Sequence, residues 1–233
     1  ERMNKWFTGK DVEEDITKLQ ELFSDANMGN QDIAFMCLEN SAAYVPINQA
    51  LWRLGVTVHP VSESTSDVEL VKDFRENQYA AIIFNASRAE VFSNFSELDK
   101  HTIQLHTFED LVILTRNDLN TSNKETTPSE QSYGWILNTS GTTGKPKEVG
   151  LTHEVILRAA HYDLESHRLN AADTVLIIMP MFHINAQELI VVSTLLSDGR
   201  LVIAPKFSAS RFWQQVMENN VTWSSVVPTI VSI

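Results

Sequence analysis

Residues 135–149 read Trp135-Ile136-Leu137-Asn138-Thr139-Ser140-Gly141-Thr142-Thr143-Gly144-Lys145-Pro146-Lys147-Glu148-Val149. An apolar run, typical of a buried strand, leads into six consecutive Thr, Ser and Gly residues. Glycines adopt backbone angles that other residues avoid, so successive N–H groups can turn inward and bind an anion. The hydroxyls add donors, and Lys147 adds a mobile positive charge. The stretch therefore predicts a polyphosphate-binding loop formed by Thr139, Ser140, Gly141, Thr142, Thr143, Gly144 and Lys147.

Two other interpretations of this stretch were weighed. A cluster of Ser, Thr and Gly is most often only a solvated loop. The common phosphate-binding P-loop requires four residues between its glycines and a Ser or Thr directly after its lysine. Here Gly141 and Gly144 enclose two residues, and Pro146 follows Lys145. The spacing excludes that motif.

The order of residues 139–147, followed by Val149 and Thr152-His153, resembles the signature of the adenylate-forming superfamily. This superfamily includes acyl- and aryl-CoA synthetases, luciferases and the adenylation domains of peptide synthetases. The resemblance runs from about Gln31 to Ile233 and is strongest in the loop. It implies that residues 141–144 hold the β- and γ-phosphates of ATP and that Lys147 follows the departing pyrophosphate. The chain departs from the family at Glu148, usually Gly, and a carboxylate there weakens the positive field unless it points to solvent.

Composition and charge narrow the function classes. The chain has 233 residues, 43% hydrophobic, and a net charge of −12, which argues against a nucleic-acid partner because Lys and Arg bind phosphate backbones. No apolar run reaches the roughly 18 residues of a membrane span, so no transmembrane segment is predicted. The lone Cys37 lies in an apolar run and is interpreted as a core residue. No export signal opens the chain, so we expect a cytoplasmic protein, with an organelle lumen such as the peroxisome as the alternative.

Apolar runs alternate with segments of helical periodicity along the chain. Strands are predicted over 33–38, 56–61, 79–84, 103–106, 175–179, 201–204 and 223–227. Helices are predicted over 11–27, 40–54, 66–78, 86–98, 152–169, 186–196 and 208–219, with Asn40 and Ser66 as N-caps and Gly55 as the end of the second helix. Because the strand runs are continuously apolar, we predict an α/β fold, a mostly parallel sheet with helices on both faces. Ligands of such sheets bind beyond the carboxyl ends of the strands, where the loop after Leu137 emerges.

Residues 116–132 are rich in Asn, Thr, Ser, Glu and Lys and are predicted to be a flexible linker. It joins residues 1–115 and 133–233, two α/β halves of what resembles the N-terminal domain of an adenylate-forming enzyme. The chain starts without methionine and stops at Ile233 without a helix cap, so we expect a fragment truncated at its C-terminal end.

A second informative stretch is Met179-Pro180-Met181-Phe182-His183-Ile184-Asn185. Spacing alone is equally consistent with a packed corner between a strand and a helix. The stretch also resembles the Pro-x-Phe-His segment that lines the acyl pocket of acyl-CoA synthetases. That resemblance implies acyl-pocket roles for Phe182, His183 and Asn185, with His183 gating the carboxylate and Asn185 disfavouring a flat aryl substrate. Lys206, at a position that approaches CoA in coumarate-CoA ligases, is a weaker candidate, equally consistent with a solvated lysine.

The resemblance implies a carboxylate substrate, ATP, Mg²⁺ and CoA for the full-length parent. The carboxylate attacks ATP to give acyl-AMP and pyrophosphate, and CoA then displaces AMP. The Mg²⁺-binding acid and the adenylation lysine are expected after residue 233, so the fragment alone is predicted to be inactive. No metal site is predicted within the chain, since Leu157 stands where a zinc-protease helix beginning at His153-Glu154 needs its second histidine. Two alternatives stay open: an adenylation domain that loads a carrier protein, and a non-catalytic nucleotide-binding module.

Overall fold

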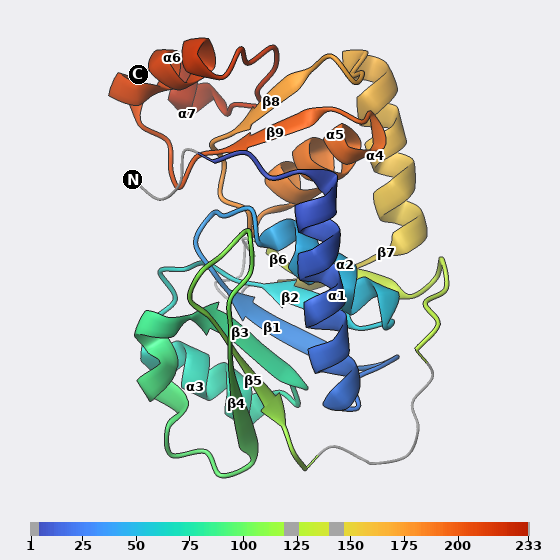
Figure 1. The fold of residues 1–233 in the computed structure, drawn as a ribbon, viewed down its shortest axis with the longest axis vertical. Coiled ribbons are helices and arrows are strands. Elements are labelled where there is room, and N and C mark those ends of the chain that lie inside the picture. The colour runs from blue at the N-terminus through green and yellow to red at the C-terminus, as the bar shows by residue number, and fades with distance from the viewer. Residues whose placement is uncertain (1–4, 119–125, 140–146, 233) are drawn as a thin grey trace.

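The computed structural model describes residues 5–118, 126–139 and 147–232. Seven strands form one sheet in the order β4-β5-β3-β1-β2-β6-β7 (Figure 1). Strands β3, β1, β2 and β6 run parallel, whereas β5 pairs antiparallel with β3 and β7 pairs antiparallel with β6. The strands are β1 Ile33–Cys37, β2 Thr57–Pro60, β3 Ala81–Asn85, β4 Leu98–Ile103, β5 Leu111–Arg116, β6 Tyr133–Thr139 and β7 Lys147–Thr152.

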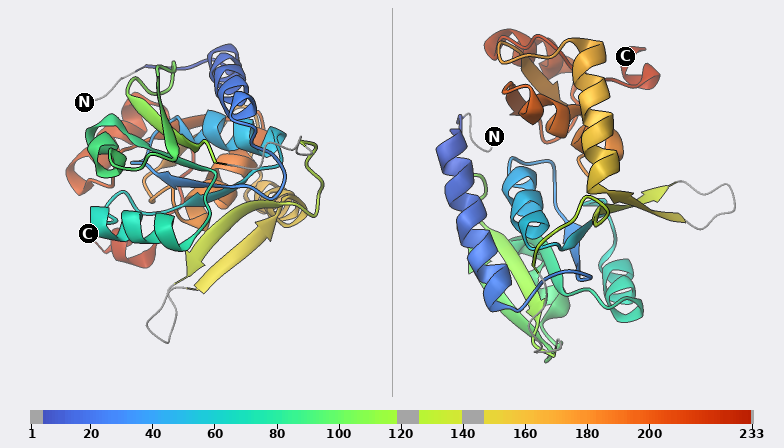
Figure 2. Two further views of the ribbon diagram at one scale, coloured as in Figure 1. Left: turned by 90° about the horizontal axis from the view of Figure 1, so that it is seen from below. Right: turned by 90° about the vertical axis from the view of Figure 1, so that its right-hand side faces the viewer.

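Helices cover both faces of this sheet. Helices α1 (Gly9–Asp25) and α2 (Tyr44–Arg53) lie on one face, and α3 (Asp67–Glu76) lies on the other, beside the 3₁₀ helix η1 (Ala86–Phe92) (Figure 2). Alternate residues of β1 therefore enter different cores: Met36 packs in the cluster of α1 and α2, and Phe35 in that of α3. Both faces of the central strands are buried, which explains their continuous apolar sequence. The predicted α/β fold with a mainly parallel central sheet is confirmed.

A second, two-stranded parallel sheet is formed by β8 (Thr174–Ile177) and β9 (Arg200–Ile203). Helix α4 (His153–His167) directly follows β7 and packs against the π-helix η2 (Asn185–Val192) and the short α5 (Ser193–Leu196). The remaining helices are α6 (Ala209–Glu218) and α7 (Pro228–Val231). Strands β6 and β7, which follow the predicted linker 116–132, pair into the first sheet. Residues 119–125 of that linker lie outside the described residues, so the linker and the two halves stay predictions.

Capping sequences fix where two helices begin. Ser66 accepts from the backbone N–H of Glu69, and the Glu69 side chain bonds back to Ser66, so the predicted capping box is confirmed. Thr8 and Asp11 form an equivalent box, which starts α1 before the predicted residue 11. Gly55 has φ +75°, a left-handed conformation that glycine adopts without strain, and it ends α2 as predicted.

Asn40 does not cap α2, so that prediction is wrong. The cap position is Ala43, which makes no side-chain bond, and Asn40 instead bonds the backbone near β8 and β9. The helix begins four residues after Asn40, at Tyr44, so the Asn40 side chain is not at its cap position.

Three further predictions from the sequence are wrong in detail, and one strand was missed. Residues 86–98 form the short η1 and then enter β4, whose edge pairing with β5 outweighs local helical preference. Residues 103–106 are not a separate strand, because β4 ends at Ile103. Residues 223–227 make one isolated bridge, Trp223 to Val175, and no strand. Strand β5 was not predicted, although its sequence is as apolar as that of its neighbours.

Candidate active site

Strands β6 and β7 form a hairpin whose ends hold the predicted phosphate loop. Thr139 pairs with Lys147, and the Thr139 hydroxyl donates to the Lys147 carbonyl at 3.1 Å. Strand β6 runs parallel to β2, so residue 139 lies at the carboxyl edge of the parallel strands, where ligands of such sheets bind. Residues 140–146 (Ser140, Gly141, Thr142, Thr143 and Gly144 among them) lie outside the described residues, so their contacts with ATP stay a prediction.

The hairpin separates the side chains of Lys147 and Glu148. Successive strand residues point to opposite faces, and Glu148 lies opposite Asn138 whereas Lys147 lies opposite Thr139. Glu148 lines an open groove on the α3 side of the sheet together with Ile136. The Glu148 carboxylate therefore points away from the face of the hairpin that carries Lys147, and both side chains are exposed.

The predicted acyl-pocket residues lie at the turn from β8 to η2. The rings of Phe182 and His183 are 4.2 Å apart, centre to centre. His183 is exposed at the surface of the chain, and partial burial of its ring still lowers its pKa, which favours the neutral imidazole. Asn185, the first residue of η2, donates through Nδ2 to the Ser225 hydroxyl at 3.1 Å. A π-helix is rare and is often found at functional sites.

Lys206 follows β9 and is exposed. Because β8 and β9 are parallel, with Ile177 opposite Ile203, their carboxyl ends emerge together and bring the 179–185 turn and Lys206 to one edge of the second sheet. Among the described residues, no hydrogen bond joins this group to Thr139 or Lys147. The predicted site residues thus form two groups, one on each sheet.

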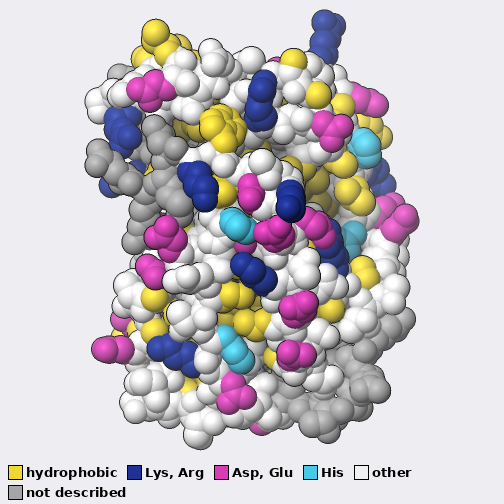
Figure 3. All heavy atoms as spheres, in the orientation of Figure 1, with side chains coloured by type: hydrophobic (Ala, Val, Ile, Leu, Met, Phe, Trp, Pro, Cys, Tyr) yellow, Lys and Arg dark blue, Asp and Glu magenta, His cyan; other side chains and the backbone are white. Residues whose placement is uncertain are grey.

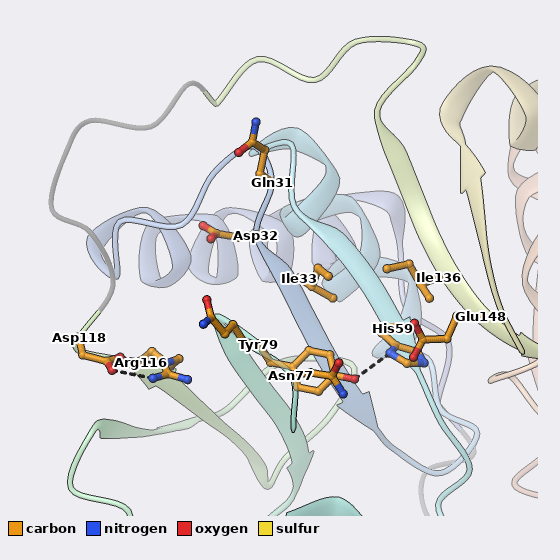
Figure 4. Close-up of a pocket in the computed structure, with 11 residues that line it drawn as sticks. Gln31, Asp32, Ile33, His59, Asn77, Tyr79, Arg116, Asp118, Ile136 and Glu148 are labelled. Atoms are coloured by element: carbon orange, nitrogen blue, oxygen red, sulfur yellow. Dashed lines mark hydrogen bonds and ion pairs between the residues drawn. The ribbon is translucent and has the colours of Figure 1, made fainter. Parts of the chain in front are cut away.

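A groove lies elsewhere, at the amino ends of β1 and β3 (Figure 4). It has a volume of about 580 Å³ and is lined by Gln31, Asp32, Ile33, His59, Asn77, Gln78, Tyr79, Arg116, Asp118, Ile136 and Glu148. It contains none of the predicted site residues that the structure describes. In parallel sheets the ligand edge is the opposite one, so this groove is not our candidate site.

One histidine in this groove is nearly inaccessible. His59 is 3% exposed, and its Nδ1 lies 3.1 Å from the hydroxyl of Tyr79. Burial lowers the pKa of His59, and the negative charge of Glu148 opposes that effect. Figure 4 shows the Glu148 carboxylate beside the imidazole. Glu148, the residue that departs from the family pattern, thus lies beside His59 of the first sheet. It is on the opposite face of the hairpin from Lys147.

Sequence reasoning missed Asn40 as a residue of the site region. Its side chain bonds the backbone on both sides of Pro180 and at the end of β9. A polar residue just beyond the carboxyl end of a buried parallel strand is the signal that identifies it.

On the face seen in Figure 3, Lys and Arg side chains are scattered among acidic ones and form no stripe. Within the described ranges, no three His, Cys, Asp or Glu side chains gather where they could hold a metal ion. Within the same ranges, every helix is too short or too polar to cross a bilayer.

Comparisons with known proteins give the family. A family model described as AMP-binding enzyme matches residues 2–233. A probable CoA ligase of Humulus lupulus is 24% identical over 233 residues, covering 95% of this chain and 44% of that protein. Sulfoacetate–CoA ligase of Cupriavidus necator is 37% identical over 105 residues, covering 45% of this chain and 21% of that protein. The chain spans less than half the length of these curated relatives.

The fold has close structural counterparts. The structure of O-succinylbenzoate coenzyme A synthetase from Bacillus subtilis, in complex with AMP, matches with a TM-score of 0.78 and 20% identity, covering 99% of this chain and 58% of that one. The family model covers nearly the whole chain, and the hairpin carries the loop sequence that first indicated a nucleotide. The chain belongs to the AMP-binding enzyme family.

Proposed function

We propose that this chain forms the N-terminal part of an ATP-dependent acyl-CoA synthetase. The parent enzyme converts a small carboxylate to acyl-AMP, releases pyrophosphate and transfers the acyl group to CoA. The observation that carries the proposal is the β6–β7 hairpin, which opens at Thr139 and Lys147 on the carboxyl edge of the parallel strands. Membership in the AMP-binding family and the CoA-ligase relatives support it.

In the first half-reaction, a carboxylate oxygen attacks the α-phosphorus of ATP, and the bond to the pyrophosphate oxygen breaks. Catalysis of this kind consists mainly of positioning and charge neutralisation. Residues 141–144 hold the β- and γ-phosphates, and the Lys147 ammonium neutralises charge on the leaving pyrophosphate. Phe182, His183 and Asn185 line the carboxylate side. A neutral His183 can donate or accept a hydrogen bond at the carboxylate without binding it as a fixed ion pair.

In the second half-reaction, the CoA thiol attacks the acyl carbonyl carbon, and AMP leaves with the bonding electrons. Lys206 is our candidate for a contact with CoA, since it lies at the same edge of the second sheet as the 179–185 turn. Mg²⁺, when bound to ATP, screens the phosphate charges. Among the described residues, no three His, Cys, Asp or Glu side chains form a possible metal site, and we assign no residue to the ion.

ATP–pyrophosphate exchange tests the proposal. The protein that carries the complete AMP-binding domain is assayed with small carboxylic acids, and thioester formation is followed with free CoA. We expect exchange with at least one acid, and we expect Lys147→Gln to lower the exchange rate about tenfold or more. Absence of exchange with every acid would indicate a non-catalytic nucleotide-binding module. Loading of a carrier protein in place of CoA would indicate an adenylation domain.

The 233-residue chain is a second arm of the test. We expect it to make no acyl-AMP on its own, because the residues assigned here hold substrates and supply no group that completes the adenylation site. Pyrophosphate exchange by the isolated chain would contradict that part of the proposal.

A further inference from the structure

The side chain of Asn40 joins the two sheets through three hydrogen bonds. Its Oδ1 accepts from the backbone N–H of Met181 at 2.7 Å. Its Nδ2 donates to the carbonyl of Met179 at 2.8 Å and to the carbonyl of Ala204 at 3.2 Å. Both the oxygen and the nitrogen of the amide form hydrogen bonds, and every partner lies shortly after the end of β8 or β9.

These partners flank the residues assigned to the substrate site. Met181 lies two residues before His183, and Ala204 lies two residues before Lys206. Pro180, between the two bonded residues Met179 and Met181, has no N–H and a fixed φ angle. The bonds on either side of Pro180 therefore hold the turn, and the third bond holds the end of β9 beside it.

Asn40 itself follows a central strand of the first sheet. It follows β1, which is flanked by β2 and β3. Residues 34–37 of this strand and residue 38, which follows it, are buried. The first sheet thus fixes the position of Asn40, and the hydrogen bonds of its amide fix the turn after β8 and the end of β9 relative to the first sheet.

We propose that Asn40 is a positioning residue for the carboxylate site: its amide fixes the 179–183 turn and the end of β9 relative to the first sheet. This inference rests on the proposed function, which places the substrate beside His183. This role differs from simply holding the two parts of the molecule together, because a second buried hydrogen bond between side-chain amides also does so. Asn48 of α2 donates to Gln187 of η2 at 2.8 Å and touches neither the turn nor the end of β9.

This second contact supplies the matched control. Asn40→Ala removes all three bonds, whereas Asn40→Asp keeps the acceptor for the Met181 N–H and loses both donations. Asn48→Ala removes a buried amide between the same two parts of the molecule.

The first measurement is hydrogen exchange of the Met181 backbone amide, by NMR on the 233-residue chain. Met181 is fully buried, so its exchange reports local opening. We expect exchange to rise about tenfold or more in Asn40→Ala, the effect of losing one or two net hydrogen bonds. We expect a smaller rise in Asn40→Asp, which keeps the acceptor for the Met181 N–H, and little change in Asn48→Ala. Equal exchange in Asn40→Ala and the unaltered chain would overturn the proposal, and so would an equal rise in Asn48→Ala.

The second measurement is steady-state kinetics with the protein that carries the complete domain. We expect Asn40→Asp to raise the KM for the carboxylate about tenfold and to leave the KM for ATP unchanged, since the phosphate loop belongs to the first sheet. Asn48→Ala should change neither KM. A parallel rise in both KM values in Asn40→Asp would show a merely structural role. If the unaltered protein shows no exchange with any acid, the proposed function fails, while the Met181 amide still tests whether Asn40 holds the turn.

Discussion

The carboxylate of Asp15 accepts two hydrogen bonds from Thr107, one from its backbone N–H at 2.9 Å and one from its hydroxyl at 2.8 Å. A third comes from the backbone N–H of His106 at 2.8 Å. Asp15 lies on α1 and is fully buried, whereas residues 106 and 107 lie in the loop between β4 and β5. The contact therefore joins α1 to the antiparallel edge of the first sheet. Both oxygens of the buried carboxylate accept hydrogen bonds.

Replacing this carboxylate is expected to destabilise the fold. Asp15→Ala leaves buried donors without a partner and should lower the free energy of unfolding by about 2–4 kcal/mol. Urea denaturation followed by circular dichroism measures the change. Glu21→Ala on the same helix, where the side chain is exposed, is the control and should have a much smaller effect. Equal losses in the two variants would contradict the assignment.

Gly55→Ala is expected to destabilise the junction between α2 and β2. Residue 55 has φ +75°, a left-handed conformation that is strained for alanine. The added Cβ would also lie 1.8 Å from the Asn30 Oδ1 atom. The backbone penalty alone is about 1–2 kcal/mol. Thermal unfolding should show a lower Tm for Gly55→Ala and an unchanged or slightly higher one for Gly9→Ala, because nothing lies within 4 Å of a Cβ at Gly9. An unchanged Tm in Gly55→Ala would mean that the turn adopts another conformation.

Glu188 is expected to stabilise the protein at acidic pH and to lose this contribution as the pH rises towards 7. Burial raises the pKa of this η2 residue from 4.5 to about 7, and Asp163 of α4 adds to the effect. The folded state then binds the proton more tightly than the unfolded state, so this contribution is present at acidic pH and is lost between about 4.5 and 7. The expected loss is about 1–3 kcal/mol.

Urea denaturation at pH 5 and pH 8 checks this expectation. Glu188→Gln should flatten the difference between the two pH values, whereas Glu165→Gln, an exposed change on α4, should leave it as it is. A pH dependence that is the same in Glu188→Gln and the unaltered chain would assign the effect to another group.

Glu148 is expected to have little influence on nucleotide binding, because the hairpin points its side chain away from the face that carries Lys147. In the protein with the complete domain, Lys147→Gln should weaken ATP binding about tenfold, and Glu148→Gln should leave it nearly unchanged. Calorimetry measures both. An independent readout is the imidazole of His59: removing the Glu148 charge should lower the pKa of His59 further, as an NMR titration would show. Tighter ATP binding in Glu148→Gln would mean that the two side chains share one face.

Local sequence determined the start of α3 and the buried strand β1. Ser66 and Glu69 are three residues apart and complete each other's hydrogen bonds within one turn, so the start of α3 needs no distant partner. The apolar run of β1 likewise identifies a strand that is buried on both faces. Strand β4 was missed because its polar sequence has weak local preference, and pairing with β5 decides its conformation.

Sequence by itself determined the family and the α/β class, because these depend on ordered local patterns, and it predicts the residues of the phosphate loop. Only the tertiary structure decided that Asn40 joins the two sheets, that Glu148 and Lys147 face apart, and that β6 and β7 complete the first sheet. The Asn40 contact depends on a partner distant in the chain, since Asn40 and Met181 are 141 residues apart. No local pattern encodes such a contact, since the energy that selects it appears only when both sheets are packed.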